Sequence, residues 1–152
     1  MMKNIIIFDL DGTLALIDER RKISTKINGK LDWDIFFNST NIKLDKPNIP
    51  VISILKSLNK EDFKIYILTG RLETTKKASL KWLSENNIEF DQFWMRKDNN
   101  VEKFLSDEIL KENWLLEIGK NNIMCVFDDR TKIVNMWRRN GVTCFQVADG
   151  NF

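Results

Sequence analysis

Histidine is absent from the 152 residues of the chain. Its absence excludes the most common general base, and with it the Ser-His-Asp and Cys-His arrangements of nucleophilic enzymes. Most zinc sites are excluded as well, because imidazole is among their usual ligands. Any catalysis must therefore depend on carboxylates, lysine, arginine or a hard metal ion.

Cysteine is scarce, and long apolar runs are missing. Cys125 and Cys144 lie in apolar, strand-like segments, so we expect buried thiols in a cytosolic protein rather than a disulfide. No run is long enough to cross a bilayer, and the N-terminal apolar run is too short for a signal peptide. A net charge of +2 does not by itself predict a nucleic-acid binder. These features predict one cytoplasmic globular domain over residues 1–152.

Short apolar segments alternate with amphipathic ones along the chain. We predict strands over residues 4–10, 63–70, 90–96, 122–129 and 142–148. We predict helices over residues 50–62, 72–87, 104–120 and 130–141. This alternation predicts an α/β fold, a three-layer Rossmann-like parallel sheet with helices on both faces. The polar, basic and irregular residues 15–48 are expected to form a small flap after the first strand.

Polar residues follow three of the predicted strands. In a parallel sheet of this kind, ligands bind beyond the carboxyl ends of the strands. The residues that the sequence places at that edge are Asp9, Asp11, Thr69, Gly70, Arg71, Asp128 and Asp129. Acids, a hydroxyl and a guanidinium from separate strands are therefore expected to meet at one site.

The residue types at this edge indicate phosphoryl chemistry. Asp9 and Asp11 are two residues apart on an extended segment and are expected to face one site, and Gly12 permits a tight turn behind them. Clustered carboxylates require a cation, and oxygen-only ligands favour Mg²⁺. A metal-bound carboxylate can attack phosphorus, while a second acid, its pKa raised by like charges, protonates the leaving oxygen. Thr69 can donate to a phosphoryl oxygen.

Three motifs resemble those of a known superfamily. "FDLDGTL", "LTGR" and "VFDDR", in this order at the strand ends, resemble the haloacid dehalogenase superfamily of aspartate-nucleophile phosphatases. The closing stretch "FDDRTKIVNMWRRNGVTCFQVADGNF" resembles the 3′-phosphatase domain of phage polynucleotide kinase-phosphatases, and "DWDIFF" and "DKPN" in the flap fit that family. The resemblance covers essentially the whole chain.

The resemblance implies a role for each acid. Asp9 would be the nucleophile and Asp11 the general acid/base. Mg²⁺ would be bound by the side chain of Asp9, the backbone carbonyl of Asp11 and the side chain of Asp128. Asp129 would support the site through water or hydrogen bonds.

The resemblance also implies the substrate-binding residues. Thr69 takes the phosphate-binding hydroxyl position, followed by Gly70 and Arg71. The family's lysine motif, in which an acid precedes an apolar residue, lysine and tryptophan, matches "DEILKENW" and gives Asp107 and Lys111.

Two of these assignments have an alternative at a nearby residue. The spacing of the lysine motif leaves Lys103 as an alternative to Lys111. Arg20 lies where the family places a substrate-binding arginine, and its neighbour Arg21 is the alternative.

Several residues also have ordinary structural interpretations. The Asp9–Asp11 pair could form a turn and a helix cap, and Asp129 could cap the helix that begins near residue 131. Lys111 could be a solvated charge on a helix. The flap's basic residues could be a solvated face or contact a polyanionic backbone: Arg20, Arg21, Lys22, Lys26 and Lys30.

The aromatic residues and the last helix raise similar alternatives. Three tryptophans lie in helical patterns and are expected to pack in the core: Trp82, Trp114 and Trp137. A base could stack on Trp33 or Trp94. Arg138 and Arg139 are expected to be surface charges.

The chain lacks a G-x-x-x-x-G-K-[ST] motif, so we expect no phosphorylation of 5′ ends by this chain alone. The flap is too short to form a closed cap, which suits a phosphate on an extended substrate. We predict a Mg²⁺-dependent phosphomonoesterase with a phospho-Asp9 intermediate, acting on 3′-phosphorylated DNA or RNA ends in nucleic acid repair. The alternatives are a nucleotidase or small-metabolite phosphatase, and an inactive module that binds nucleic-acid ends.

Overall fold

Five parallel strands form the main sheet of the computed structural model, which describes residues 2–152. The strands are β1 (Ile5–Phe8), β4 (Lys64–Leu72), β5 (Gln92–Arg96), β6 (Ile123–Asp128) and β7 (Cys144–Gln146). Their order is β5-β4-β1-β6-β7, so the first strand of the chain is central. Every neighbouring pair in this sheet is parallel. The predicted α/β sheet is confirmed.

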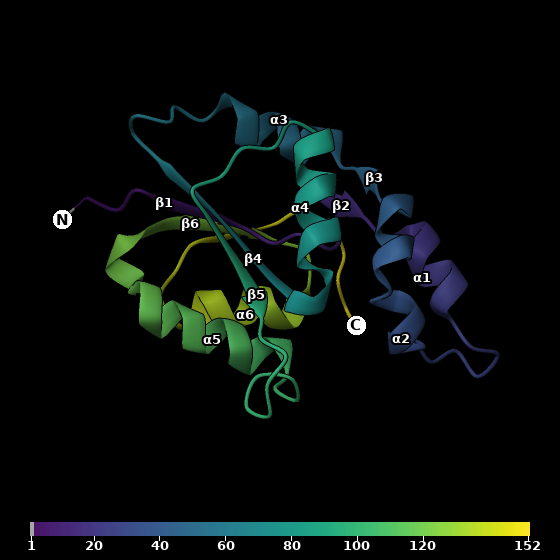
Figure 1. Ribbon diagram of the computed structural model, residues 1–152. Coiled ribbons are helices and arrows are strands. Elements are labelled where there is room, and N and C mark those ends of the chain that lie inside the picture. Colours follow the sequence, from purple (N-terminus) through teal and green to yellow (C-terminus); the bar gives the residue numbers. More distant parts are fainter. Residues whose placement is uncertain (1) are drawn as a thin grey trace.

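Helices cover both faces of the sheet (Figure 1). On one side lie α3 (Ile49–Ser57) and α4 (Lys76–Glu85), and on the other lie α5 (Asp107–Ile118) and α6 (Thr131–Arg139). Short 3₁₀ helices precede α4 and β6, as η2 (Glu73–Thr75) and η3 (Lys120–Asn122). These four α-helices lie where the sequence pattern predicts them and are shorter than predicted, although α3 begins one residue earlier, at Ile49.

The apolar run of β1 is explained by this double cover. Ile6 and Phe8 point into the core cluster on the α3 and α4 side, whereas Ile5 and Ile7 point into the cluster of α5 and α6. Successive side chains of a strand point to opposite faces, so a strand covered on both faces must be apolar throughout. Each of these side chains contributes roughly 1.5–3 kcal/mol when it is fully buried. The residues after Phe8 are therefore held by a firmly packed strand.

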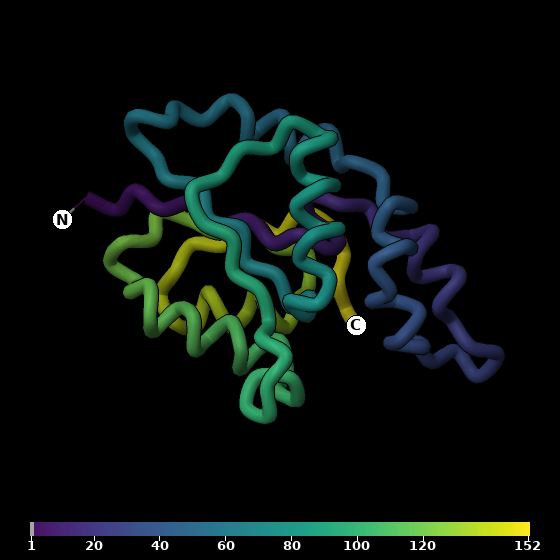
Figure 2. Tube along the Cα trace, in the orientation of Figure 1, coloured from purple at the N-terminus to yellow at the C-terminus, as the bar shows by residue number. Residues whose placement is uncertain are grey.

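The flap contains more regular structure than the sequence analysis predicted. The short strands β2 (Ala15–Leu16) and β3 (Lys46–Pro47) pair antiparallel at its base. Between them lie α1 (Asp18–Ser24), α2 (Trp33–Phe36) and the 3₁₀ helix η1 (Ser39–Leu44). The tube in Figure 2 shows this segment, purple to blue, beyond the end of the sheet opposite the N-terminus. The helices of the flap thus stand over the carboxyl ends of the strands.

The remaining predictions about the core are largely confirmed. Cys125 and Cys144 are free, buried thiols. Trp82, Trp114 and Trp137 are buried. Within residues 2–152, no helix is long and apolar enough to span a membrane.

Candidate active site

The carboxyl ends of β1, β4 and β6 surround a cavity of about 300 Å³. Asp9 and Asp11 follow β1 and both line this cavity, together with Thr69 and Gly70 of β4 and Asp128 of β6. The backbone N–H of Asp9 donates to the carbonyl of Phe127 (3.0 Å), which continues the pairing of β1 with β6 past the last strand residue. The sheet therefore holds the first acid in a fixed position.

Gly12 lets the first loop pass close to the end of β6. Its φ angle is +83°, and a Cβ at this position would lie 2.1 Å from Oδ2 of Asp129. Thr13 lies in the same turn and its hydroxyl donates to both Asp9 (3.5 Å) and Asp129 (3.4 Å). The loop thus connects two of the acids by a side chain that the sequence analysis did not single out.

Lys111 is the buried cation of the site. It enters from α5, and its Nζ donates to Oδ1 of Asp9 (2.7 Å) and to Oδ2 of Asp128 (2.8 Å). The lysine is 3% exposed, so the solvated-charge interpretation is wrong. Its burial lowers its pKa, but Asp128 and Asp9 outweigh this effect and hold the pKa above its usual value, so the side chain is charged. Lys103, the alternative, forms an ion pair with Asp98 (3.0 Å) and does not line the cavity.

Three carboxylates converge beside this lysine. Asp9, Asp128 and Asp129 each offer an oxygen, and these oxygens lie within 4.8 Å of one another. Burial raises the pKa of Asp9 well above its usual value, since Asp128 and Asp129 add to the effect and Lys111 opposes it only in part. Burial and the charge of Asp128 raise the pKa of Asp129 to about 6. Three buried carboxylates that offer only oxygen donors within reach of one another fit a hard divalent cation such as Mg²⁺, which would favour their ionised form.

Asp129 does not cap the last helix. The residue before α6 is Arg130, and no side chain caps the N-terminus of this helix. The carboxylate of Asp129 instead lies over Gly12 and accepts from Thr13. It lies beside Asp9 and Asp128, and its supporting role at the site stays a prediction.

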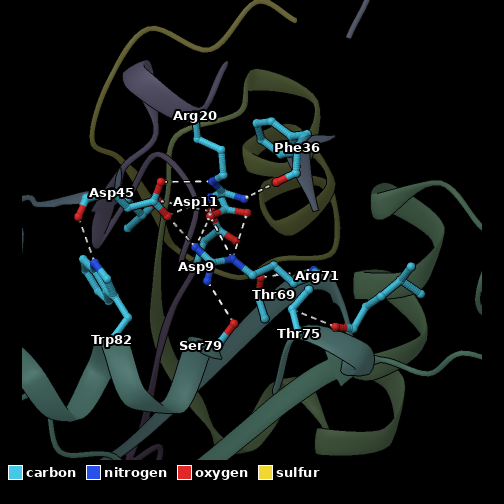
Figure 3. Close-up of polar contacts among 12 residues, drawn as sticks. Asp9, Asp11, Arg20, Phe36, Asp45, Thr69, Arg71, Thr75, Ser79 and Trp82 are labelled. Carbon is cyan, nitrogen blue, oxygen red and sulfur yellow. Dashed lines mark hydrogen bonds and ion pairs between the residues drawn. The ribbon is translucent and has the colours of Figure 1, made fainter. Parts of the chain in front are cut away.

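Asp11 is held by two buried arginines (Figure 3). Its Oδ1 accepts from Arg20 (2.5 Å) and from Arg71 (2.5 Å), and Arg71 also donates to it through Nε at 3.0 Å. Burial raises the pKa of Asp11, but the charges of Arg71 and Arg20 outweigh it and lower the pKa to about 2. The expectation that like charges raise the pKa of this acid is wrong, because its nearest neighbours are cations.

Asp45 completes this network and was missed in the sequence analysis. It lies at the end of the flap, is buried, and accepts from Nε of Arg20 (3.0 Å) and from the guanidinium of Arg71 (2.9 Å) (Figure 3). Burial raises its pKa to about 6 against the opposing charge of Arg20, so the group is ionised at neutral pH. Its backbone carbonyl accepts from Trp82 Nε1 (2.9 Å). In the sequence, the only indication of its importance was the "DKPN" stretch, which begins with Asp45 and fits the family. That resemblance did not assign a role to Asp45.

The two flap arginines have different environments. Arg20 is fully buried, and its guanidinium stacks on Phe36 at 4.4 Å while it binds Asp11 and Asp45. It is therefore not part of a solvated face, and its direct contact with substrate stays a prediction. Arg21 lines the cavity, with its guanidinium 4.3 Å from the ring of Phe152.

The end of β4 supplies a hydroxyl and a close backbone approach. Thr69 is buried, lines the cavity, and its hydroxyl accepts from the backbone N–H of Arg71 (3.2 Å). A Cβ on Gly70 would lie 2.5 Å from Oδ1 of Asp107, so a larger residue here would displace this carboxylate. The three positions predicted from "LTGR" are thus brought to the site edge.

Asp107 is the first residue of α5, and its carboxylate pairs with two arginines. Its carboxylate accepts from Arg96 and, at 2.8 Å, from Arg130, and it lines the cavity. The buried Arg96, missed in the sequence analysis, also donates to the carbonyl of Gly70 (2.9 Å). Asp107 therefore connects the start of the lysine helix to the end of β4.

The remaining aromatic and basic residues discussed in the sequence analysis differ in their surroundings. Trp33 is 58% exposed and lines the cavity, whereas Trp94 is partly buried and packs edge-on against Trp114. Arg139 forms surface ion pairs with glutamates of α5, and Arg138 donates to the carbonyl of Cys144.

Comparison with known proteins identifies the family. Residues 3–152 match the family model described as the polynucleotide kinase PNKP phosphatase domain. Two solved structures of a Pnkp1/Rnl/Hen1 complex, one of them described as an RNA repair complex, contain chains that superpose on 99% of this chain. Their TM-scores are 0.78 and 0.77, at 29% and 32% sequence identity. A bifunctional polynucleotide kinase/RNA ligase of Autographa californica nuclear polyhedrosis virus is 28% identical over 137 residues, 88% of this chain.

These relatives are longer than the chain described here. The chain covers 48% and 44% of the two solved chains and 17% of the viral protein. A solved structure described as a predicted phosphatase from Clostridium acetobutylicum, 16% identical with a TM-score of 0.71, shares the fold over 96% of the chain.

Proposed function

Since the chain belongs to the polynucleotide kinase PNKP phosphatase-domain family and is a haloacid dehalogenase-type phosphatase, we propose that it removes 3′-phosphates from polynucleotide ends through a phospho-Asp9 intermediate. The observation that carries the proposal is the buried Lys111 ammonium, which donates to both Asp9 and Asp128 at the ends of two buried strands. This arrangement holds a carboxylate beside a fixed positive charge in a cavity open to a phosphate.

In the first step, a carboxylate oxygen of Asp9 attacks phosphorus and the ester P–O bond breaks. The phosphoryl group is then bonded to Asp9, and the leaving 3′-oxygen takes a proton. The Lys111 ammonium and the Thr69 hydroxyl lie in the same cavity and would stabilise the charge on the phosphoryl oxygens. Hydrolysis of phosphate monoesters is among the slowest uncatalysed reactions and requires up to ~10²¹-fold acceleration, so several groups must act together.

Asp11 is the proposed acid and base. In the free protein Arg20 and Arg71 keep it ionised and fix the direction of its carboxylate. Bound phosphate adds negative charge beside Asp11, which raises the pKa of this carboxyl group and favours its protonated form. The protonated carboxyl group then donates its proton to the leaving oxygen. In the second step the ionised carboxylate takes a proton from the water that attacks phosphorus, which releases inorganic phosphate and restores Asp9.

The acidic cluster is the proposed Mg²⁺ site. The side chains of Asp9 and Asp128 and the backbone carbonyl of Asp11 would hold the ion, with Asp129 in support, and all of these donors are oxygens. When bound, the ion would neutralise the carboxylates and polarise the phosphoryl group.

The substrate assignment rests on the family and on the form of the site. Relatives in this family include chains of an RNA repair complex, which supports a nucleic-acid end as substrate. The small flap leaves the cavity open, and aromatic and basic side chains line it, including Trp33, Arg21 and Arg130. An extended strand with a terminal phosphate fits such a site better than a small metabolite.

Phosphate release from paired oligonucleotides tests this proposal. One oligonucleotide carries a 3′-phosphate and its isomer carries a 5′-phosphate, and both are assayed with Mg²⁺, with a small aryl phosphate as a generic substrate. Between the two oligonucleotides we expect release from the 3′-phosphate only, with slower turnover of the aryl phosphate, and no release from any substrate with Asp9→Asn. Turnover of the aryl phosphate without either oligonucleotide would instead indicate a nucleotidase or small-metabolite phosphatase. Binding without any turnover would indicate an inactive end-binding module.

A further inference from the structure

A second hollow, of about 690 Å³, is continuous with the active-site cavity. The two share five lining residues: Trp33, Phe37, Gly70, Asp107 and Arg130. One wall is the flap helix α2, and the other is the loop from residue 97 to 106, which joins β5 to α5 (Figure 1). We call this hollow the α2 groove. It leads from the proposed phosphate site to the surface.

Both walls of the α2 groove carry exposed aromatic rings. Trp33 is 58% exposed on one wall, and Phe104 is 79% exposed on the other. Trp33 lies nearly parallel to Phe37, with ring centroids 5.7 Å apart and 16° between the planes. Single exposed aromatics are common on protein surfaces, but two that line the same groove next to a phosphatase site offer flat faces for the bases of a nucleic-acid strand.

The loop that presents Phe104 is anchored. Arg96 donates to the carbonyls of Glu102 (2.7 Å) and Leu105 (2.6 Å), at either side of the aromatic residue. The side chain of Asn99 accepts from the backbone N–H of Glu102 (2.8 Å). A fixed loop lowers the entropy that ordering would cost when a ligand binds.

The charges along the groove favour a polyanion. Lys103 and Arg130 both line it. Arg96 lines it as well, and its two acids are Asp34 and Asp107, so the lining holds three cations and two acids, a net charge of +1. Asp107 pairs with Arg96 and Arg130, and Lys103 pairs with Asp98 outside the lining. A small excess of positive charge next to two exposed rings suits a single-stranded nucleic acid bound without sequence preference.

We propose that the α2 groove binds the single-stranded nucleotides that precede the 3′-terminal phosphate, with their bases stacked on Trp33 and Phe104. The inference rests on the proposed function, because the strand reaches the groove only if its terminal phosphate occupies the cavity. It adds to that function a reason for preferring polynucleotides over mononucleotides. A protein partner would also use exposed aromatics, but it would not require the continuity with the cavity.

The test compares two substrates across a small set of variants. Values of kcat/KM are measured with Mg²⁺ for a 3′-phosphorylated oligonucleotide and for a small aryl phosphate, and their ratio is the readout. We expect Trp33→Ala and Phe104→Ala each to lower this ratio by about 5- to 150-fold, the range for loss of one base–aromatic stack. Trp33→Phe retains a ring and should keep most of the ratio.

Val101→Ala is the matched control. Val101 is in the same loop and 72% exposed but does not line the groove, so its substitution should leave the ratio unchanged. A ratio that stays at the wild-type value in Trp33→Ala and Phe104→Ala would overturn the groove assignment and leave the proposed function standing. An equal loss on both substrates would also overturn it, because it would indicate damage to the catalytic site. Wild-type protein that releases no 3′-phosphate would overturn the proposed function itself.

Discussion

Lys111→Met removes the positive charge at the centre of the site while it keeps most of the apolar stem. In the wild type the ammonium bridges Asp9 and Asp128 at 2.7 and 2.8 Å and is 3% exposed. Removal of one partner from a buried ion pair costs about 3–5 kcal/mol, because the remaining charges stay buried without compensation. For a domain of this size each kcal/mol lowers Tm by roughly 2–4 °C, so we expect a decrease of about 6–20 °C without divalent metal.

The loss of stability should depend on pH. Lys111 lowers the pKa of Asp9, so its removal raises that pKa further above the value in the unfolded chain. The folded variant then keeps a proton that the unfolded chain releases near pH ~4, and its stability falls as pH rises from there to the folded pKa of Asp9. Protonation at low pH relieves the repulsion, so the deficit against wild type should be smaller at the acidic end of this window.

Thermal melts and steady-state kinetics measure these effects. Mg²⁺ should restore more stability to Lys111→Met than to wild type, because it supplies the missing charge, while kcat should remain reduced by roughly 10²- to 10³-fold. For the thermal melts, Lys103→Met is the matched control, since its exposed pair with Asp98 contributes at most about 1 kcal/mol. A variant with wild-type Tm and the same response to Mg²⁺ would refute the reasoning that the lysine compensates the acidic cluster.

Three further predictions follow from the same geometry. Gly12→Ala should lower stability by about 1–3 kcal/mol and reduce activity, because the new methyl group meets Asp129 at a φ of +83°; Gly141→Ala, at +79° with no atom within 4 Å, should keep its activity, and equal activities in the two variants would contradict this account. Asp45→Asn should reduce kcat by up to about 100-fold with little change in KM, because Asp45 aligns the two arginines that orient Asp11 and does not itself line the cavity. A change in KM alone would argue against this positioning role. Chelation of divalent metal should abolish turnover, and readdition of Mg²⁺ should restore it and raise Tm, since a ligand that binds only the folded state stabilises it; turnover that persists in chelator would exclude the proposed metal.

Much of the fold was predictable because strands and helices have distinct patterns of apolar residues: continuous short runs in the strands and helical spacing in the helices. The run from Ile5 to Phe8 has no polar position, which predicts a strand covered on both faces, and Pro50 and Gly119 mark helix ends in the pattern. The flap was less predictable. Its helices are short, and α2 has only four residues, so no periodic pattern can form.

The acids at the strand ends were predictable, but their charge states were not. Asp9 follows β1 and Asp128 is the last residue of β6, so both had to lie at the carboxyl edge of the parallel sheet. The pKa of Asp11 depends on Arg20 and Arg71, which lie 9 and 60 residues from it in sequence. Contacts of this kind are created by tertiary packing and leave no local pattern.

Asp45 shows the same limit. An acid in a polar segment, two residues before a proline, is usually exposed, and only the fold places it between two guanidinium groups. The choice between Lys111 on α5 and Lys103 in the preceding loop likewise depended on how α5 packs against the sheet edge, and of the two the structure places Lys111 against Asp9.

Trapping of the phosphoenzyme tests the central claim most directly. The protein turns over a saturating 3′-phosphorylated oligonucleotide with Mg²⁺, is quenched in acid, and is reduced with borohydride, which converts an aspartyl-phosphate to homoserine. The account predicts that peptide mass spectrometry finds homoserine at residue 9, and no modified residue in Asp9→Asn. Homoserine at another aspartate, or turnover by Asp9→Asn, would contradict the claim that Asp9 carries the phosphoryl group.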